Sequence, residues 1–500
     1  MPRTAWTPAQ RWGFWAILAL AAALRGWAAL NTGPVHPDEI FQYLEQAHRL
    51  VFGHGVVTWE YRYGMRSWLL PLLLSVPMQI GAWIDPASEL YLVLPRLSMV
   101  ALSLLAVVAA YGLGARLSRF HAFAAMAAAA VWPDIVYFGG HVLTEPASTA
   151  LVLAGAALLL PAETSRRRLV LAGLLLGLAA VLRFHYLPAM AVLALLSCGT
   201  QWRARWLPVI GGGLIAAAVG GAVDIAMGQA PFGWMIANVT QNVVADRAAN
   251  YGVQPPFFYL QLLGGMWSFG FVAIVLLIVP VLRPYRALIC AAAVNLLLHS
   301  LIGHKEYRFI FLSVALLVIV AAIGSAELIR RLQPRLSLKA GLLAAAALIP
   351  VWFGASAALA SGSSLPNHWR AFLAGSEAAR MLRAEPNICG VGVVGMLVWD
   401  AGGYTTYRHS VPFYVNGAPM GAETDPPLPV LAPAFNGIIA PERKEASLPA
   451  GYRRIGCSAP EAGIGNGGPT RVCAYRRSGG CDPAAAPDQE LQTVMKRRDW

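Results

Sequence analysis

The sequence predicts an all-α protein that crosses a membrane many times and carries a small α/β domain near its C-terminal end. Three observations predict this. The chain of 500 residues is 57% hydrophobic and 13% charged, with a mean hydropathy of +0.55, whereas soluble chains carry about 25% charged residues. Long apolar stretches alternate with short basic clusters, and the composition changes after residue 360. These features exclude a soluble enzyme, a disulfide-rich miniature scaffold and a disordered chain.

Eleven apolar stretches approach the roughly 20 residues that a helix needs to cross about 30 Å of hydrocarbon. They are 12–30, 92–115, 120–138, 146–162, 168–182, 184–198, 206–226, 263–282, 286–302, 309–328 and 340–359. A twelfth stretch, 67–84, contains Pro71 and Pro77. The basic clusters all fall on one side, as the positive-inside rule requires, only if 67–84 does not cross. We therefore expect 67–84 to lie in the outer interface, the N-terminus to be cytoplasmic and residues 360–500 to lie outside.

The outer loops then hold most of the loop residues, which favours chemistry on the outer face. We expect a transmembrane catalytic domain over 1–359, with its catalytic motif in the first outer loop, 31–91. Short β-like runs in a Gly- and Pro-rich tail predict an α/β domain over 360–480, followed by a disordered end at 481–500. Four cysteines of this tail can form two disulfides, in a pairing that the sequence leaves open: Cys389, Cys457, Cys473 and Cys481.

The first outer loop contains His36-Pro37-Asp38-Glu39 ahead of an amphipathic helix. Asp38 could be the N-cap of this helix, with Glu39 favoured by the helix dipole. Alternatively, the two adjacent carboxylates supply a general base at the membrane surface. These residues alone leave both interpretations open.

A second polar group, His304-Lys305-Glu306-Tyr307-Arg308, lies between two strongly apolar stretches. Ionisable residues are costly there unless they pair or bind a ligand. Glu306 could pair with Lys305 or Arg308, or the two cations could form a pocket for a phosphate. We favour the phosphate pocket.

Other outer-loop candidates are His141, Glu145, Arg183 and Tyr251, each of which taken singly could be a packing or anchoring residue. Together, such groups from several loops suit a lipid phosphate whose headgroup reacts at the surface. No Walker A motif, zinc-protease motif or G-x-S-x-G is present, and no G-x-G-x-x-G follows a predicted strand. Despite a net charge of +13, no basic stripe with interleaved aromatics indicates a nucleic acid partner.

These motifs resemble those of glycosyltransferase family 22, which contains mannosyltransferases that use dolichyl-phosphate mannose. The resemblance covers about residues 12–415, in the family's order. It rests on His36-Pro-Asp-Glu39, Thr58-Trp-Glu-Tyr61, Arg66-Ser67, His141-Val-Leu-Thr-Glu145, Tyr251-Gly252, Phe258-Tyr-Leu260, His304-Lys-Glu-x-Arg-Phe309, Gly402-Gly-Tyr404 and Val411-Pro-Phe-Tyr414. It implies the GT-C fold of multispanning transferases, with membrane-lying helices and an essential acid in the first outer loop.

The resemblance also implies an inverting transfer of a hexose, expected to be mannose, from a polyprenyl-phosphate sugar to a lipid-linked or envelope glycan. Asp38 is then the base, with Glu39 as the contender. The donor phosphate and substrate would contact His36, His141, Glu145, Arg183, Tyr251, His304, Lys305, Glu306 and Arg308. No cofactor or metal is implied, although a divalent cation is left open.

The basic residues comprise 34 Arg and 4 Lys, together 38, which hints at a GC-rich bacterial genome. We therefore expect a bacterial inner membrane, with the α/β domain in the periplasm. Two other functions stay open: a flippase or secondary transporter for lipid-linked sugars, and an oligosaccharide polymerase or ligase that uses a diphosphate lipid. The transferase interpretation requires that Asp38 and the cluster at 305–308 meet across one cavity at the outer rim of the membrane.

Overall fold

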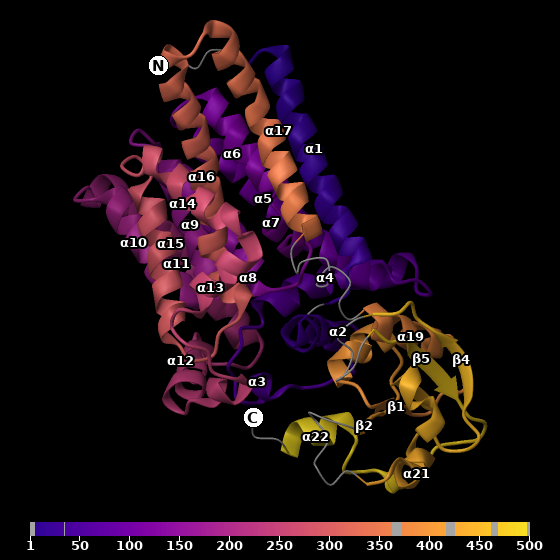
Figure 1. The fold of residues 1–500 in the computed structure, drawn as a ribbon. Coiled ribbons are helices and arrows are strands. Elements are labelled where there is room, and N and C mark those ends of the chain that lie inside the picture. Colours follow the sequence, from indigo (N-terminus) through magenta and orange to yellow (C-terminus); the bar gives the residue numbers. More distant parts are fainter. Residues whose placement is uncertain (1–5, 35, 363–372, 417–425, 462–468, 498–500) are drawn as a thin grey trace. The chain divides into compact units, whose positions relative to one another are not determined.

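The computed structural model describes residues 6–34, 36–362, 373–416, 426–461 and 469–497. The chain divides into two compact units, each of which is described by itself (Figure 1). The helical unit comprises residues 1–29 and 97–366, and the α/β unit comprises residues 30–96 and 367–500. The α/β unit therefore includes the first predicted outer loop, which differs from the predicted boundaries of 1–359 and 360–480.

The helical unit is built from helices that cover every predicted apolar stretch except 67–84. These helices are α1 (Pro8–Asn31), α5 (Leu90–Gly114), α6 (Arg119–Val131), α7 (Pro133–Phe138), α8 (Thr144–Leu159), α9 (Arg166–Leu182), α10 (Leu187–Cys198), α11 (Leu207–Ala226), α12 (Gly233–Val239), α13 (Phe258–Trp267), α14 (Phe269–Ile278), α15 (Arg286–Leu301), α16 (Phe311–Leu332) and α17 (Leu338–Gly362). Among the helices long enough to span a membrane, α16 is the most deeply buried: 89% of its most apolar 18 residues lie inside the protein. It therefore forms the centre of the bundle.

Five helices of the described chain are long and apolar enough to cross a membrane. They are Pro8–Asn31, Leu90–Gly114, Trp202–Ala226, Tyr307–Arg335 and Leu338–Gly362. Helices α13 and α14 add a sixth if they form one span; they meet at 105° beside Ser268, whose φ is 49°. Further apolar helices have only 10–17 residues. The multispanning all-α class is confirmed, and the number of eleven crossings stays a prediction.

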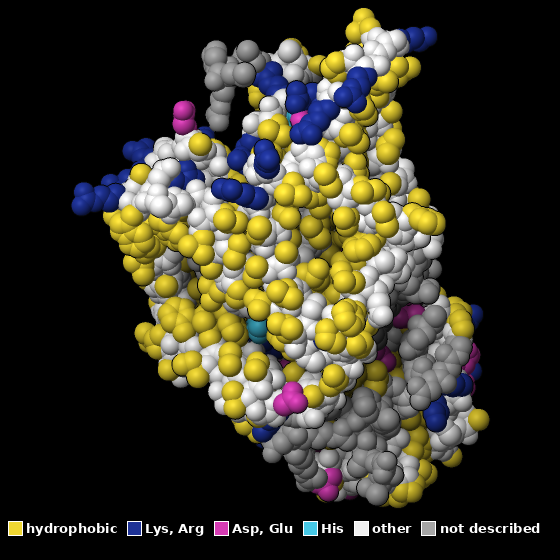
Figure 2. All heavy atoms as spheres, turned by 60° about the vertical axis from the view of Figure 1, so that its left-hand side comes forward, with side chains coloured by type: hydrophobic (Ala, Val, Ile, Leu, Met, Phe, Trp, Pro, Cys, Tyr) yellow, Lys and Arg dark blue, Asp and Glu magenta, His cyan; other side chains and the backbone are white. Residues whose placement is uncertain are grey.

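Contacts between the loops of the helical unit support the predicted alternation of inner and outer loops. Arg116 Nη1 donates to Pro284 O at 3.2 Å, and Arg331 Nη2 donates to Pro280 O at 2.7 Å, so predicted inner loops are neighbours. His304 contacts Gly252 O, which brings together the segments 227–262 and 303–308, both predicted as outer loops from the positions of the apolar stretches. Figure 2 shows basic side chains gathered at one end of the long helices, beyond a band of hydrophobic side chains. This distribution is the one that the positive-inside rule describes.

The α/β unit is organised around a five-stranded sheet in the order β2-β1-β3-β5-β4. Strand β1 pairs in parallel with β2 and β3, and β5 pairs antiparallel with β3 and β4. The strands are β1 (Val391–Val394), β2 (Phe413–Asn416), β3 (Gly437–Pro441), β4 (Arg453–Cys457) and β5 (Val472–Arg476). The sheet and its strands confirm the predicted small α/β domain. Gly390, Gly392 and Gly395 have the spacing of a dinucleotide-binding fingerprint, but that motif must follow a strand, and here the residues between the glycines form β1 itself.

Short helices of the α/β unit come from both of its chain segments. The first segment contributes η1 (Glu39–Leu44), α2 (Glu45–Phe52), α3 (Trp59–Arg62) and α4 (Leu69–Ile84). The second contributes α19 (Leu373–Arg383), α20 (Gly403–Tyr407), α21 (Leu428–Leu431) and α22 (Leu491–Arg497). Ile40, Phe41 and Val56 of the first segment are at most 4% exposed and belong to the same core cluster as strand residues Val391 and Phe413. One hydrophobic core therefore joins both segments.

The predicted disorder of residues 481–500 is wrong for 481–497. Cys481 is bonded to Cys389, and Leu491 of α22 is completely buried in the core. Gln492 reinforces this packing, because its side chain accepts a hydrogen bond from Val57 N at 3.0 Å. Residues 498–500 lie outside the described residues. The polar, Pro-rich composition of residues 481–497 predicted disorder, but contacts with distant parts of the chain hold this segment in place.

Helix α4 coincides with the stretch predicted to lie in the membrane interface. Leu73, Val76, Ile80 and Trp83 lie along one face, and their exposed fractions range from 42% to 73%. Met78 on the other side is completely buried. An exposed apolar face of this kind fits a helix that lies in the interface, so the position of α4 remains a prediction that the exposure supports.

Two disulfides link the cysteines of the α/β unit. Cys389 pairs with Cys481 over a sequence separation of 92 residues, and Cys457 pairs with Cys473 over 16. Cys198 and Cys290 of the helical unit are free. The structure thus resolves the pairing that the sequence leaves open.

We predict that the two disulfides stabilise the α/β unit unequally. Because cross-linking restricts the unfolded chain more when the closed loop is longer, the 92-residue loop should contribute about 4–5 kcal/mol and the 16-residue loop about 3 kcal/mol. Replacing Cys389 and Cys481 together by Ser should therefore lower Tm more than replacing Cys457 and Cys473 together. Thermal unfolding of the purified variants checks this order, and the reverse order would contradict it.

Candidate active site

Asp38 and Glu39 differ in exposure, and this difference separates the two candidate bases. Asp38 occupies the N-cap position of η1 and is half-buried, whereas Glu39 is completely buried. Among the described residues, the Asp38 side chain makes no capping hydrogen bond, although it has other interactions. The helix-capping interpretation of Asp38 therefore receives no support, and Asp38 is the carboxylate of the two that solvent and substrate can reach. His36, also half-buried, lies two residues before it.

Glu60 is a further carboxylate of the first loop that lies close to Asp38. It is 7% exposed, and Gln42 Nε2 donates to its Oε1 at 2.7 Å. Burial raises the pKa of Glu60; Arg66 opposes this rise, and the negative charge of Asp38 adds to it. Burial and the neighbouring charge of Asp38 therefore make the Glu60 carboxyl harder to ionise than it is in water.

In the helical unit, one buried carboxylate holds two arginines. Glu145 Oε1 lies 2.9 Å from Arg183 Nη1 and 3.2 Å from Arg308 Nη1. Glu145 is completely buried, and the two arginines are 7% and 6% exposed. These residues come from the start of α8, the end of α9 and the segment η7 (Tyr307–Ile310). Three segments far apart in the sequence thus converge on one ionic centre.

Phe309 forms a platform for this centre. The guanidinium carbons of Arg183 and Arg308 lie 5.1 Å and 5.0 Å from the centroid of its ring. Arg308 is fixed further by Glu306, whose Oε2 accepts from Nε at 2.8 Å and whose Oε1 accepts from Nη2 at 3.0 Å. We call Glu145, Arg183, Glu306 and Arg308 the cation cluster. Its planar cations are held in place before any ligand binds.

His304 and Tyr251 flank the cation cluster. His304 Nε2 lies 2.9 Å from Glu306 Oε1, and the His304 and Tyr251 rings are 5.8 Å apart. Burial lowers the pKa of His304, but the hydrogen bond with Glu306, the negative charge of Glu306 and the hydrogen bond with Gly252 O together outweigh it, so the pKa is raised overall. Tyr251 is 48% exposed, which leaves its ring accessible. His141 packs on Tyr137, with ring centroids 4.5 Å apart.

Lys305 is used differently from our expectation for a phosphate ligand. Its Nζ donates to Gln254 O at 3.1 Å and to Ile302 O. Burial lowers the pKa of Lys305. Lys305 therefore joins its own loop to the preceding outer loop. Of the two ion pairs considered for Glu306, the structure forms the one with Arg308.

Asp134 is a buried carboxylate that the sequence analysis did not single out. Its Oδ1 accepts from Tyr307 Oη at 2.7 Å, and its Oδ2 accepts from Trp132 Nε1 at 2.7 Å and from Trp267 Nε1 at 2.9 Å. Because Tyr307 directly precedes Arg308, this carboxylate orients the segment that carries the cation cluster. An acidic residue inside an apolar stretch was a usable signal. Glu60 likewise stands in a quoted motif, Thr58-Trp-Glu-Tyr61.

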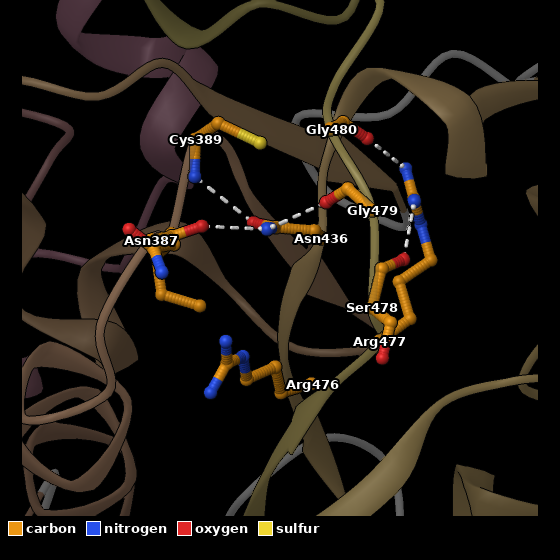
Figure 3. A pocket seen from close by; sticks show the side chains of 9 residues that line it. Asn387, Cys389, Asn436, Arg476, Arg477, Ser478, Gly479 and Gly480 are labelled. Carbon is orange, nitrogen blue, oxygen red and sulfur yellow. Dashed lines mark hydrogen bonds between the residues drawn. The ribbon is translucent and has the colours of Figure 1, made fainter.

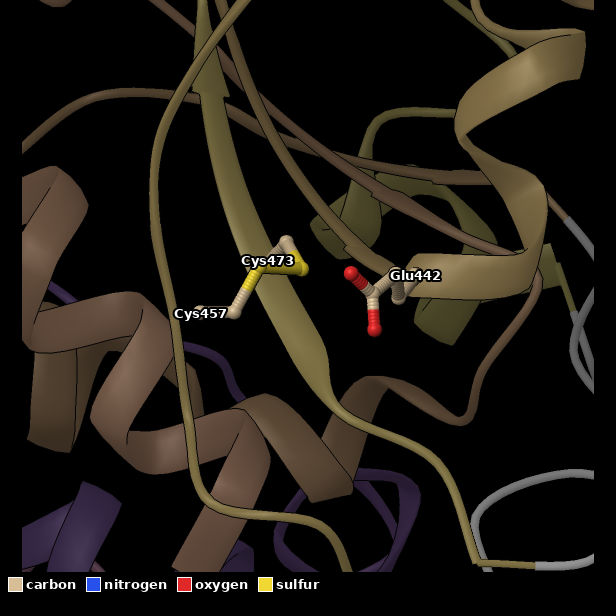
Figure 4. Close-up of side chains that lie close together, drawn as sticks. All are labelled: Glu442, Cys457 and Cys473. Atoms are coloured by element: carbon tan, nitrogen blue, oxygen red, sulfur yellow. A yellow bond between two sulfur atoms is a disulfide. The ribbon is translucent and has the colours of Figure 1, made fainter.

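Two other polar groupings occur in the α/β unit. A pocket of about 510 Å³ lies beside Cys389, but the fold uses its polar side chains: Asn436 bonds three backbone groups, and Arg476 pairs with Glu385 (Figure 3). Glu442 lies within 4.8 Å of two sulfur atoms, which form a disulfide and are not thiolates (Figure 4). Neither grouping contains a predicted site residue.

Asp38 and the cation cluster belong to different compact units. Each unit is described by itself, so the expected meeting of the two groups stays a prediction. Within the helical unit, the structure brings together Glu145, Arg183, Tyr251, His304, Glu306 and Arg308. Within the α/β unit, it brings Asp38 close to Glu60.

Residues 15–364, which carry most of these side chains, match the Alg9-like mannosyltransferase family. The chain belongs to this family. The resemblance to glycosyltransferase family 22 is thereby confirmed. Among curated relatives, GPI mannosyltransferase 3 of Yarrowia lipolytica is 30% identical over 323 residues, which are 61% of each chain. GPI alpha-1,2-mannosyltransferase 3 of Homo sapiens is 28% identical over 300 residues, 55% of this chain and 51% of that protein.

The chain thus matches between half and two thirds of the length of these Alg9-like relatives. Among solved structures, ArnT from Cupriavidus metallidurans bound to undecaprenyl phosphate has a TM-score of 0.61 at 14% identity. The likeness covers 94% of this chain and 99% of that chain. At such low identity it shows the fold alone, and it confirms the predicted multispanning fold.

We predict that Glu145→Gln destabilises the helical unit strongly. Removing the shared counter-charge leaves Arg183 and Arg308 close together, and breaking a buried ion pair costs about 3 kcal/mol or more. Glu306→Gln is the matched control, because the Glu306 side chain is 21% exposed and water can compensate its loss. Thermal unfolding in detergent should show the larger decrease for Glu145→Gln. Equal decreases would contradict the bridging role.

Proposed function

We propose that this Alg9-like protein is a membrane-embedded inverting glycosyltransferase. It moves a hexose, mannose in our proposal, from a polyprenyl-phosphate sugar to a lipid-linked or envelope glycan. The observation that carries the proposal is the pair Arg183 and Arg308, held on the Phe309 ring by Glu145. Arginine forks suit phosphate oxygens, and their fixed positions need no rearrangement when charge develops.

In the proposed reaction, Asp38 takes the proton of an acceptor hydroxyl as its oxygen attacks the anomeric carbon of the donor. The bond between this carbon and the phosphate oxygen breaks, and the electron pair leaves with the polyprenyl phosphate. Attack from the face opposite to the phosphate inverts the configuration. Arg183 and Arg308 stabilise the growing negative charge of the phosphate. Because these cations come from the chain itself, no step of the proposal uses a metal ion.

The proposed setting is the periplasmic face of a bacterial inner membrane. The basic inner loops and the two disulfides of the α/β unit support this orientation, since disulfides persist in oxidising compartments. The curated relatives named above come from eukaryotes, so the acceptor of this protein need not be the one in their names. His36, His141, Tyr251 and His304 complete the proposed substrate contacts, while Lys305 and Glu306 hold the loop that carries Arg308.

Purified protein with radiolabelled polyprenyl-phosphate mannose and a lipid extract of the cell envelope tests the function. Transfer of label to an extractable glycan is the expected result. A parallel reaction with a polyprenyl-diphosphate oligosaccharide separates the proposed transferase from a polymerase or ligase. Turnover of the diphosphate donor alone would overturn the proposal.

We predict that Asp38→Asn gives a folded protein with about 10²–10⁴-fold lower kcat, because the positioned base is lost. Glu39→Gln, at the buried neighbour, should retain more than a tenth of the activity of the unsubstituted protein. Initial rates at saturating donor and acceptor measure both variants. Normal turnover by Asp38→Asn would remove Asp38 from the role of base, and a selective loss in Glu39→Gln would transfer that role to Glu39.

We predict that Arg308→Ala weakens the use of the donor more than the use of the acceptor. Removing one preorganised charge at the leaving group should lower kcat by about 10²–10³-fold, with a higher KM for the donor and a nearly unchanged KM for the acceptor. Arg331→Ala is the control, because its side chain is 56% exposed in a predicted inner loop. Steady-state kinetics with each substrate varied in turn check this. Equal effects on both substrates would indicate a purely structural role.

A further inference from the structure

Glu45 is a buried carboxylate that connects the two chain segments of the α/β unit. It is completely buried at the start of α2. Its Oε1 accepts from Val56 N at 2.9 Å, and its Oε2 accepts from Thr405 N at 2.9 Å and from Thr405 Oγ1 at 2.6 Å. Residues 360 positions apart in the sequence are therefore joined by two hydrogen bonds to one oxygen atom.

Thr405 directs all of its polar groups to the first segment. Its N–H and hydroxyl donate to Glu45, and its carbonyl accepts from Tyr91 Oη at 2.8 Å. Tyr91 in turn accepts from Arg383 Nη1 at 3.2 Å. Thr405 of the second segment is thus bonded to two residues of the first segment, Glu45 and Tyr91. We call this arrangement the clamp.

Two glycines allow this close approach. Gly403 has a φ of +60°, and a Cβ atom there would lie 3.1 Å from the Phe41 ring and 3.4 Å from Glu45 Oε2. Gly55, with a φ of +141°, would bring a Cβ atom within 3.1 Å of Glu45 Oε1. A side chain at Gly403 would therefore crowd Phe41, and one at Gly55 would crowd Arg49 and the Glu45 carboxylate. Gly403 lies in the Gly402-Gly-Tyr404 motif.

Burying a carboxylate at this position costs free energy, because the group loses its hydration. Burial raises the pKa of Glu45, and the hydrogen bonds from Thr405 and Val56 only partly oppose that rise. Apolar residues of similar volume fill such sites at lower cost. What a carboxylate adds is direction, because its oxygens must face the donors of Thr405 and Val56. It therefore fixes the rotation of the helix that carries it.

That helix leads directly to the candidate base. Asp38 has helical backbone angles, the π-helical η1 follows it, and η1 continues into α2 at Glu45. Gln46 Nε2 donates to Phe41 O at 2.7 Å and to Val56 O at 2.9 Å, which stiffens the junction. π-helical turns are rare and often occur at functional sites.

We propose that Glu45, clamped by Thr405, is a positioning residue that sets the orientation of Asp38. The C-terminal segment then acts as the scaffold of the catalytic loop. This inference rests on the proposed function, since it concerns how the base is held. In this proposal, Thr405 and the Gly402-Gly-Tyr404 motif affect catalysis indirectly, by holding Glu45 in place.

The test compares Glu45→Gln, Thr405→Val and Thr405→Ser in the full-length protein. In Glu45→Gln, the side-chain NH₂ group faces a hydrogen-bond donor of Thr405 or Val56 and cannot accept from it. Thr405→Val removes the hydroxyl that donates to Glu45, whereas Thr405→Ser keeps it. We expect Glu45→Gln and Thr405→Val to lower kcat about 10- to 100-fold through misplacement of the base, with the KM for the donor changed less than threefold. Thr405→Ser should restore kcat to within about threefold of the original.

Tyr452→Phe is the matched control for a loss of stability alone. It removes a 2.6 Å hydrogen bond to Phe435 O in the same unit, beside the second core cluster. We expect it to lower Tm without lowering kcat. If Tyr452→Phe lowers kcat as much as Thr405→Val does, the loss reflects general destabilisation and the proposal is overturned.

Amide hydrogen exchange separates this inference from the proposed function, because it needs no substrate. Thr405→Val should speed exchange in residues 39–44 and leave strand β1 unchanged. Unchanged exchange in residues 39–44 would overturn the clamp. If exchange responds but the unsubstituted protein transfers no mannose from a polyprenyl-phosphate donor, the proposed function fails and the clamp stands.

Discussion

Buried charges must be paired, and this constraint organises both units of the protein. In the helical unit, the arginines of the cation cluster are almost completely inside an apolar bundle, where an unpaired cation is very costly. Glu145 satisfies both of them, and so it fixes the relative positions of α8, the end of α9 and η7. The pairing also creates a rigid array of donors, which is the property that binding of a phosphate requires. The same bonds thus serve folding and the proposed chemistry.

The α/β unit meets the constraint in a different way. Glu45 has no cationic partner among its hydrogen bonds in the described chain; three donors from the backbone and from Thr405 surround it. Such a site tolerates little displacement, because each donor becomes a buried unsatisfied group if the carboxylate moves. The disulfide between Cys389 and Cys481 acts at a distance from this point and ties the C-terminal end to the sheet. Covalent and polar restraints therefore hold one core that is built from two distant chain segments.

Patterns that are local in the sequence were predictable, and contacts between distant segments were not. Hydropathy identified the long apolar helices, because this signal needs only a short window. The distribution of basic clusters along the chain set 67–84, now α4, apart from them. The Gly-Val run at 390–394 predicted a strand for the same reason. By contrast, nothing local indicates that residues 30–96 share a core with residues 367–500, since residues 97–366 separate the two segments in the sequence. The ordered end at 481–497 was missed for this reason as well.

The candidate site shows the same limit at the level of single side chains. The sequence could place Lys305 and Arg308 in one loop, but only the backbone geometry decides that the ammonium meets carbonyl groups and the guanidinium meets carboxylates. The two carboxylates of the first loop are distinguished in a similar manner. Burial and the charge of Asp38 raise the pKa of Glu60. Asp38 is half-buried, so solvent and substrate can reach its carboxylate. Environment, more than residue type, therefore distinguishes Glu60 from Asp38, the proposed base.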